Sequence, residues 1–155
     1  EDKPLGTGGA IKNAFSHLAA DWQPNLIVNG DTWYEADIVG LHSFAQDQQH
    51  APVCLSVKPM PLNDRYGSVV LESNGSISGF RGEPSDQANI NAGCYYIQPQ
   101  ALQTFLSNYP DTFSFESECL PKLAETGQLS GYVCDATFLD IGIPTDYAKA
   151  ASLLR

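Results

Sequence analysis

The chain has 155 residues, of which 43% are hydrophobic and 17% charged, and its formal net charge is −10. This length suits one domain with a core of its own, and the apolar content excludes a disordered chain. The acidic balance argues against nonspecific binding to nucleic acid or to an anionic membrane, because both carry negative charge.

The N-terminal part begins with glycines. Gly6-Thr7-Gly8-Gly9 is predicted as a loop whose backbone N–H groups can approach a nucleotide or another anion at the start of a helix. Apolar residues at helical spacing predict that helix over about 9–20. The short apolar run at 25–28 is typical of a buried parallel strand.

The middle of the chain predicts a helix, a strand and a hairpin. Residues 36–48 form the helix and 53–58 the strand. Two further runs, 68–71 and 77–80, flank a linker that contains Asn74-Gly75, which is a strong hairpin signal.

The last third continues the alternation of strands and helices. A strand is predicted at 91–97, helices at 99–107 and about 115–125, short strands at 132–134 and 138–140, and a last helix from Pro144. Ser114 is suited to cap the second of these helices. The whole pattern predicts an α/β layered fold with a largely parallel sheet and one inserted hairpin.

Four cysteines are widely spaced, without a Cys-x-x-Cys pair. Cys54, Cys94 and Cys134 lie in strand-like apolar runs, where we expect buried free thiols. Free thiols favour a reducing compartment, so the sequence predicts a cytoplasmic protein. The chain begins at Glu1 rather than at a methionine, which indicates that residues upstream of it are absent.

Two aspartates follow apolar runs directly. Asp31 comes after the run at 25–28, and Asp140 ends the run at 138–140. In open α/β sheets ligands bind beyond the carboxyl ends of the strands, so both side chains are predicted at a functional edge. Together they could hold Mg²⁺, which takes one or two carboxylates plus substrate phosphates. The alternative is that each aspartate caps a turn beside a glycine.

Five motifs occur in order along the chain. They are Pro4-Leu5-Gly6-Thr7-Gly8-Gly9-Ala10, Asn29-Gly30-Asp31-Thr32, Arg65-Tyr66-Gly67-Ser68-Val69, Asn91-Ala92-Gly93 and Phe138-Leu139-Asp140-Ile141-Gly142-Ile143-Pro144-Thr145-Asp146-Tyr147. This series closely resembles the sugar-phosphate nucleotidyltransferases, and within them the branch that contains D-glycero-D-manno-heptose 1-phosphate guanylyltransferase. The resemblance spans nearly the whole chain.

The resemblance implies a fold and an activity. The fold is a Rossmann-like, mostly parallel sheet of the nucleotide-diphospho-sugar transferase type. The activity is a Mg²⁺-dependent transfer of a nucleoside monophosphate from a nucleoside triphosphate, GTP above all, to a sugar 1-phosphate of the heptose or mannose type, with release of pyrophosphate. These two molecules are the expected partners, for use in nucleotide-sugar and polysaccharide biosynthesis.

The resemblance also implies roles for individual residues. Asp31 and Asp140 would be the catalytic residues and the Mg²⁺ ligands. The nucleoside would lie against Gly6, Thr7 and Gly8. The sugar would be bordered by Gly67, Glu83, Asn91 and Gly93; for the two glycines the alternative is a turn or packing role.

The chain departs from the family in two places. Family members carry a first strand and a glycine-rich phosphate loop with a lysine near their N-terminus, and this chain has neither. Residues 1–155 are therefore expected to form one domain, the C-terminal portion of a nucleotidyltransferase domain, inactive alone. We expect its sheet to expose an edge or apolar face that a partner segment or self-association covers.

The second departure is at Phe80-Arg81-Gly82-Glu83-Pro84, which stands where the family usually has Phe-x-Glu-Lys. Arg81 is the cation in this stretch, and the sequence leaves open whether it replaces that lysine, because arginine does not reproduce its geometry. This change motivates the alternative function, a non-catalytic regulatory subunit that binds sugar nucleotides on the same fold.

Overall fold

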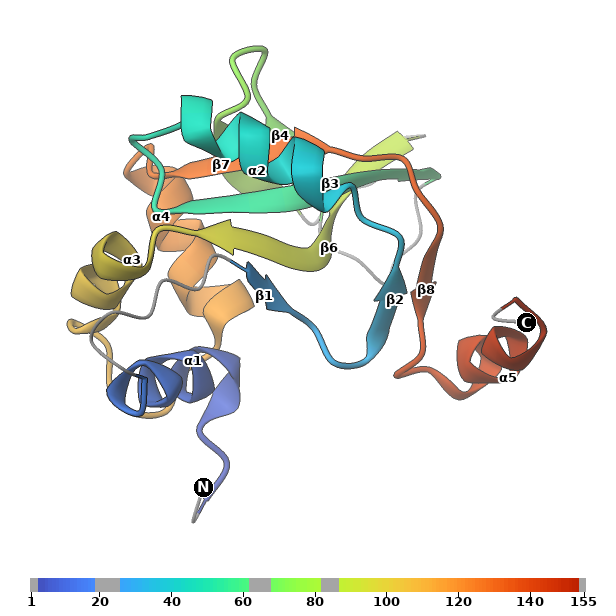
Figure 1. Ribbon diagram of the computed structural model, residues 1–155, viewed down its shortest axis with the longest axis horizontal. Coiled ribbons are helices and arrows are strands. Elements are labelled where there is room, and N and C mark those ends of the chain that lie inside the picture. The colour runs from blue at the N-terminus through green and yellow to red at the C-terminus, as the bar shows by residue number, and fades with distance from the viewer. Residues whose placement is uncertain (1–2, 19–25, 62–67, 82–86, 154–155) are drawn as a thin grey trace.

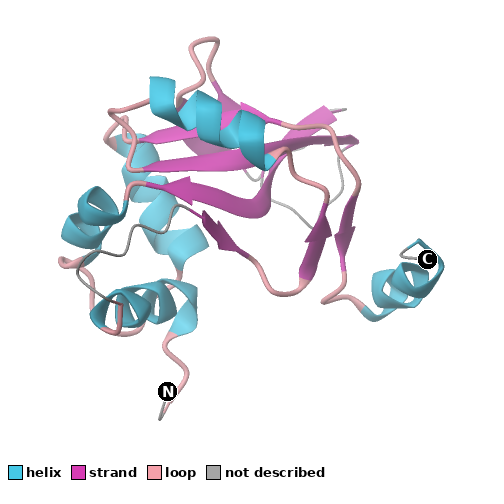
Figure 2. Ribbon diagram, in the orientation of Figure 1, coloured by secondary structure: helices cyan, strands magenta, loops and turns pink. Residues whose placement is uncertain are grey.

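A six-stranded mixed sheet lies at the centre of the molecule, with helices on both faces (Figure 1 and Figure 2). The structure is a computed structural model that describes residues 3–18, 26–61, 68–81 and 87–153. Five strands follow the order β5-β4-β6-β3-β7, and β1 pairs with β6 off this path. Their bounds are β1 Leu26–Val28, β3 Val53–Pro61, β4 Ser68–Leu71, β5 Ile77–Arg81, β6 Gln87–Ile97 and β7 Leu129–Val133.

The predicted α/β class and the inserted hairpin, β4–β5, are confirmed. Strand direction corrects the expectation of a largely parallel sheet. β3 and β7 pair parallel, whereas the other described pairs of this sheet are antiparallel. Continuous apolar runs indicate strands buried on both faces, and helices provide that burial here whichever way the strands run.

Side chains that point alternately to the two faces of the central strands form two layers of the core. Val53, Leu55 and Val57 of β3 join the buried cluster that contains leucines of α3 (Pro99–Leu106) and α4 (Leu120–Glu125). Cys54, between them, joins the cluster under α2 (Ile38–Asp47). Successive side chains of a strand point to opposite faces, so one strand supplies both layers.

All four cysteines are buried and free, which confirms the expected thiols. Burial raises the pKa of Cys54 and of Cys94 to about 11, because the apolar surroundings disfavour the thiolate. None of the described helices has the length and apolar character needed to cross a bilayer.

The N-terminal glycines belong to a helix rather than to a loop. α1 spans Gly6–Ser16, so it begins three residues before the predicted start at Gly9. The backbone N–H groups of Gly8 and Gly9 donate to the carbonyl oxygen of Phe113 at 3.1 and 3.3 Å. A Cβ on Gly8 would lie 2.2 Å from the Phe113 ring, so glycine is required for this close approach.

β1 differs from the expected buried parallel strand. It runs antiparallel to β6, with Ile27 opposite Tyr95, and none of the other described strands pairs with it. Leu26 is 40% and Val28 58% exposed. The apolar run therefore marks the strand but not burial on both of its faces.

A two-stranded antiparallel ribbon stands beside the sheet (Figure 1). It consists of β2, Thr32–Tyr34, which the sequence did not predict, and β8, Phe138–Asp140, which it did. α5, Pro144–Leu153, continues beyond the ribbon.

The predicted helix at 115–125 begins differently from an ordinary α-helix. Its first part is a π-helix, Phe115–Cys119, which runs directly into α4. The expected cap is present, since the Ser114 hydroxyl accepts a hydrogen bond from the Ser117 N–H at 3.1 Å. Short π-helical turns occur frequently at functional sites.

Candidate functional site

Two adjoining pockets open beside the end of β1. The first, here called the helix-side pocket, has a volume of about 630 Å³ and is lined from α1, β1 and the π-helix. The second, the ribbon-side pocket, has about 480 Å³ and is lined from β6, the π-helix and the β2–β8 ribbon. Asn29, Asp31 and Glu116 line both pockets, so these residues form the boundary between them.

Asp31 and Asp140 are brought together by the β2–β8 ribbon. β2 begins directly after Asp31, β8 ends at Asp140, and Thr32 pairs with Asp140 in the register. Asp31 Oδ2 and Asp140 Oδ1 each lie 3.2 Å from the point that a Cβ on Gly142 would occupy. The two oxygens are therefore no further apart than twice that distance.

Gly142 holds this pair in place. Its backbone N–H donates to Asp140 Oδ1 at 3.1 Å and to the Asp31 carbonyl oxygen at 3.2 Å. The loop after β8 is thus hydrogen-bonded to the loop before β2 directly beside the two carboxylates.

The donor set suits a hard cation such as Mg²⁺, which prefers carboxylate oxygens and keeps positions open for phosphate oxygens and water. Within the described residues, no group of three or more His, Cys, Asp and Glu side chains could hold a metal ion. The pair formed by Asp31 and Asp140 would therefore need ligands from a bound phosphate group.

Asn91 and Gly93 lie where β6 bends away from β4 and begins to pair with β1. Gly93 has a φ of +70°, and its N–H donates to Asn91 Oδ1 at 3.0 Å. A Cβ there would come within 2.6 Å of Asn29 Nδ2, while the Asn29 N–H donates to the Gly93 carbonyl at 2.8 Å. Glycine therefore lets Asn29 reach the boundary of the pockets.

Of the residues predicted to contact a nucleoside, some line a pocket and others do not. Thr7 lines the helix-side pocket. Gly6 and Gly8 instead face Phe113, and a Cβ on Gly6 would lie 2.5 Å from the Phe113 carbonyl oxygen. The predicted sugar residues Gly67 and Glu83 lie outside the described residues.

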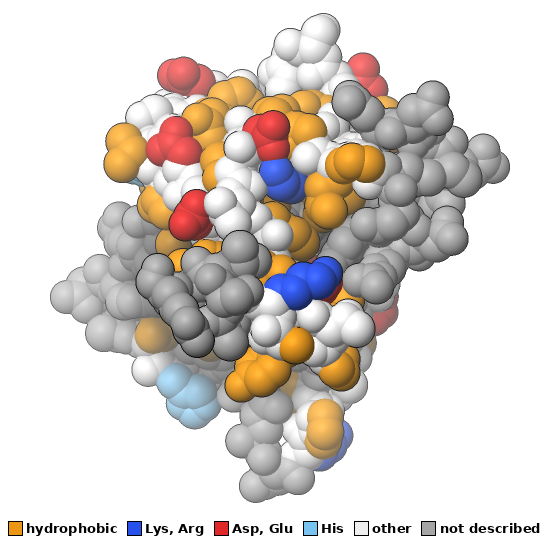
Figure 3. Space-filling model, turned by 90° about the vertical axis from the view of Figure 1, so that its right-hand side faces the viewer, with side chains coloured by type: hydrophobic (Ala, Val, Ile, Leu, Met, Phe, Trp, Pro, Cys, Tyr) orange, Lys and Arg blue, Asp and Glu red, His pale blue; other side chains and the backbone are white. Residues whose placement is uncertain are grey.

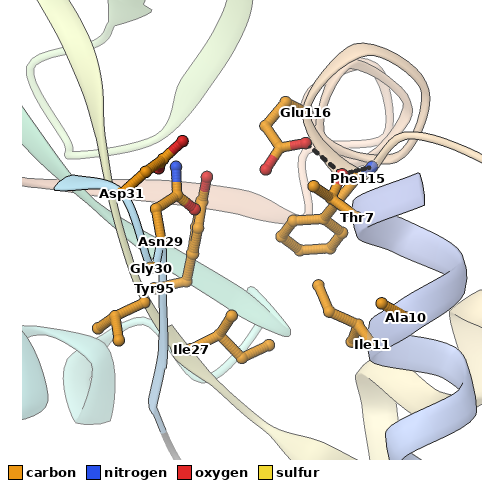
Figure 4. Close-up of a pocket in the computed structure, with 11 residues that line it drawn as sticks. Thr7, Ala10, Ile11, Ile27, Asn29, Gly30, Asp31, Tyr95, Phe115 and Glu116 are labelled. Atoms are coloured by element: carbon orange, nitrogen blue, oxygen red, sulfur yellow. Dashed lines mark hydrogen bonds between the residues drawn. The ribbon is translucent and has the colours of Figure 1, made fainter. Parts of the chain in front are cut away.

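Three residues that border the pockets were not predicted as site residues from the sequence. They are Glu116, Tyr95 and Asn29. The Thr7 hydroxyl donates to Glu116 Oε2 at 2.5 Å and accepts a hydrogen bond from the Phe115 N–H at 2.9 Å (Figure 4). In the same view the carboxylate of Asp31 lies across the opening from Glu116. The signal for Glu116 was its place in the first turn after the Ser114 cap, which also suits a purely structural acid.

Tyr95 is 1% exposed, and its ring packs edge-on against Phe115 with the ring centroids 5.3 Å apart. Burial and then the negative charge of Glu116 raise the pKa of Tyr95 above its ordinary value, and the hydroxyl therefore keeps its proton at neutral pH.

The face seen in Figure 3 carries the ribbon side of the molecule. On its described part, lysine side chains lie next to acidic ones and are separated by apolar side chains rather than gathered together.

Comparison with known proteins decides the family. A family model described as nucleotidyl transferase matches residues 1–155. The chain belongs to the nucleotidyl transferase family. This membership confirms the family that the five motifs indicated.

Two relatives within the family are named D-glycero-alpha-D-manno-heptose 1-phosphate guanylyltransferase. The chain is 35% identical to the protein from Aneurinibacillus thermoaerophilus, with all of the chain and 65% of that protein covered. It is 31% identical to the protein from Campylobacter jejuni, with 95% of the chain and 62% of that protein covered. The chain thus spans somewhat less than two thirds of each relative's length.

A solved structure shows the same fold. The crystal structure of HddC from Yersinia pseudotuberculosis complexed with GMP-PN superposes with a TM-score of 0.78 at 34% identity, covering all of this chain and 65% of that one. The nucleotide-sugar transferase type of α/β fold is therefore confirmed.

Proposed function

We propose that the protein is a sugar 1-phosphate guanylyltransferase. It transfers the guanylyl group of GTP to a sugar 1-phosphate of the heptose or mannose type and releases pyrophosphate. The names of the relatives support guanine, and two of them support heptose. A third relative, from Mycobacterium tuberculosis, is named mannose-1-phosphate guanylyltransferase and is 30% identical, which supports mannose as the second candidate sugar.

One observation carries the proposal. Asp31 and Asp140, from distant parts of the chain, meet beside two adjoining pockets, and Asp31 borders both. A reaction that joins two anionic substrates needs two neighbouring subsites and a centre that offsets their negative charge where they meet. The helix-side pocket would take the nucleoside and the ribbon-side pocket the sugar phosphate.

The chemistry proposed is a single in-line displacement. An oxygen of the sugar phosphate attacks the α-phosphorus of GTP, and the bond from that phosphorus to the bridging β-phosphate oxygen breaks, so pyrophosphate leaves with that electron pair. Asp31 and Asp140 would hold Mg²⁺, which would supply positive charge to offset the negative charge of the two anionic substrates. Thr7 would border the nucleoside, and Asn91 and Gly93 the sugar.

The test is pyrophosphate release by the full-length protein. GTP with D-glycero-α-D-manno-heptose 1-phosphate or mannose 1-phosphate is expected to give turnover that requires Mg²⁺, and ATP, UTP and dTTP much less. Absence of pyrophosphate with every triphosphate and sugar phosphate contradicts the proposal. Binding of GTP in calorimetry without any turnover favours the alternative, a non-catalytic regulatory subunit.

We also propose that the protein works in the cytoplasm, where its buried free thiols remain reduced. The exposed apolar residues Leu26 and Val28 of β1 support self-association or a partner segment at this edge. Light scattering after size-exclusion chromatography measures the mass, and a well-behaved monomer of this chain, 16.8 kDa, would contradict self-association.

A further inference from the structure

A line of polar contacts leads from the ribbon-side pocket into the core. The Gly93 N–H donates to Asn91 Oδ1 at 3.0 Å, and Asn91 Nδ2 donates to the Tyr95 hydroxyl oxygen at 2.9 Å. Asn91 and Gly93 line the pocket in which the proposed function places the sugar phosphate. The position of Tyr95 is therefore tied to the wall of that pocket.

Tyr95 carries this line of contacts to the other pocket. Its side chain lines the helix-side pocket, whereas Asn91, which donates to its hydroxyl oxygen, lines the ribbon-side pocket. The Tyr95 ring packs edge-on against Phe115, and Glu116 follows Phe115 directly in the chain. Because Tyr95 is almost fully buried, these contacts fix the position of its side chain.

A second line of contacts reaches Glu116 from the helix-side pocket. The Thr7 hydroxyl accepts from the Phe115 N–H at 2.9 Å and donates to Glu116 Oε2 at 2.5 Å. Glu116 lines both pockets, so this hydrogen bond joins Thr7 to the boundary between them. Figure 4 shows Glu116 and Thr7 joined in this way above the Phe115 ring.

We propose that Glu116 and Tyr95 are positioning residues that couple the two pockets, so that each substrate binds more tightly once the other is bound. The proposal rests on the function proposed above. A nucleotide that contacts Thr7 orders one end of this chain of contacts, and a sugar phosphate that contacts Asn91 orders the other end. The second ligand then loses less conformational entropy on binding, which gives positive cooperativity without a change of fold.

Calorimetry on the full-length protein tests the coupling. The probes are GTP with a methylene group in place of its α,β-bridging oxygen, which cannot react, and D-glycero-α-D-manno-heptose 1-phosphate, both with Mg²⁺. In the unmodified protein, saturating sugar phosphate is expected to raise the affinity for the analogue about 5-fold or more. The reverse titration must give the same factor, because the coupling is reciprocal.

Tyr95→Phe removes the hydroxyl and keeps the ring. We expect the coupling factor to fall from about 5-fold or more to below about 2-fold, because the hydrogen bond from Asn91 is lost. Tyr109→Phe is the matched control, because the Tyr109 hydroxyl donates to the Glu118 carbonyl at 3.2 Å and lines neither pocket. This control is expected to retain the full factor.

Glu116→Gln is the second variant, for the case in which Tyr95→Phe does not fold. It keeps the shape but removes the charge, and it is also expected to lower the factor. A factor of one in the unmodified protein, or a full factor in both variants, overturns the inference and leaves the proposed function standing. Failure of the unmodified protein to bind either probe overturns both.

Discussion

Asp31 and Asp140 are the residues on which the proposed reaction depends most directly. Asp31→Asn and Asp140→Asn each remove a negative oxygen from the pair, and loss of several kcal/mol of charge stabilisation corresponds to about a 1000-fold lower turnover. Pyrophosphate release measures this loss. The thermal unfolding midpoint is expected to stay close to that of the unmodified protein, because the amide has the same shape.

The control for this pair is Asp111→Asn. Asp111 is 86% exposed and pairs with Lys12 away from both pockets, so turnover is expected to be unchanged. Normal turnover in Asp31→Asn or in Asp140→Asn would contradict their assignment as catalytic residues.

Gly93 gives a second prediction at the scale of one residue. Gly93→Ala combines a left-handed backbone, which costs about 1–2 kcal/mol with a side chain, with a Cβ 2.6 Å from Asn29 Nδ2. We expect a lower unfolding midpoint and, because Asn29 borders both pockets, a raised KM for the sugar phosphate. Thermal unfolding and steady-state kinetics measure the two effects.

Gly127 offers a matched control for this strain. Its φ is +67°, and a Cβ there would meet nothing within 4 Å. Gly127→Ala is therefore expected to lose only the stability that the backbone strain costs, without any change in KM. An equal rise of KM in both variants would show that the contact with Asn29 has no part in binding.

The sequence could predict those site residues whose position along the chain is itself informative. Asp31 and Asp140 follow apolar strands, which marks them for a functional edge of a sheet. Glu116 carries no such mark, because an acid in the first turn of a capped helix is common for reasons of stability alone. Tyr95 lies inside an apolar run, and only the fold brings it to the helix-side pocket beside Phe115.

At the scale of elements, the β2–β8 ribbon positions both carboxylates. An isolated two-stranded ribbon is marginally stable, so it relies on the packing of residues such as Leu139, which is 8% exposed. Leu139→Ala is expected to cost about 2–5 kcal/mol of stability and to raise the Mg²⁺ concentration needed for half-maximal turnover. Denaturant unfolding and a Mg²⁺ titration of pyrophosphate release measure these changes.

Leu129→Ala is the matched control for the ribbon. Leu129 is fully buried on β7 and lines neither pocket. It should lose similar stability while the Mg²⁺ requirement stays the same. If both variants shift the Mg²⁺ requirement equally, the ribbon has no special part in placing the carboxylates.

Most elements could be predicted from the pattern of apolar residues, but three features could not. β2 has only three residues, too few for a periodic signal. The π-helix at Phe115–Cys119 has the same apolar spacing as the start of an α-helix. The glycines of α1 suggested a loop because their contact partner, Phe113, is far away in the sequence.

At the scale of the whole molecule, the thiols link stability to pH. Burial raises the pKa of Cys54 and Cys94 from 9.0 to about 11 and that of Cys119 to about 12. Below pH 9 the thiols are neutral in both the folded and the unfolded chain, so their contribution to the stability of the fold is fully present. Above pH 9 the unfolded chain loses protons first, and each thiol then lowers stability by about 1.4 kcal/mol per pH unit.

Thermal unfolding across this range tests the linkage. The midpoint is expected to be level below pH 9 and to fall as the pH rises toward 11. Cys94→Ala should make this fall less steep by the contribution that one buried thiol makes to the loss of stability with pH. A midpoint that is constant through pH 11 would contradict the burial of the thiols.

The order of the motifs along the whole chain predicted the family and the layered fold. It did not predict strand direction, because burial by helices on both faces leaves the same apolar runs in parallel and antiparallel strands. The long strand β6 pairs with β4 near its start and with β1 near its end, and this arrangement depends on long-range contacts.

Burial of every native cysteine makes the molecule convenient for spectroscopy. A Val39→Cys substitution would place a new thiol on α2 at a position where the present side chain is 76% exposed. A maleimide dye would then attach at this single accessible position and leave the core thiols unmodified. Fluorescence anisotropy of the labelled protein would follow assembly at nanomolar concentration without removal of any native cysteine.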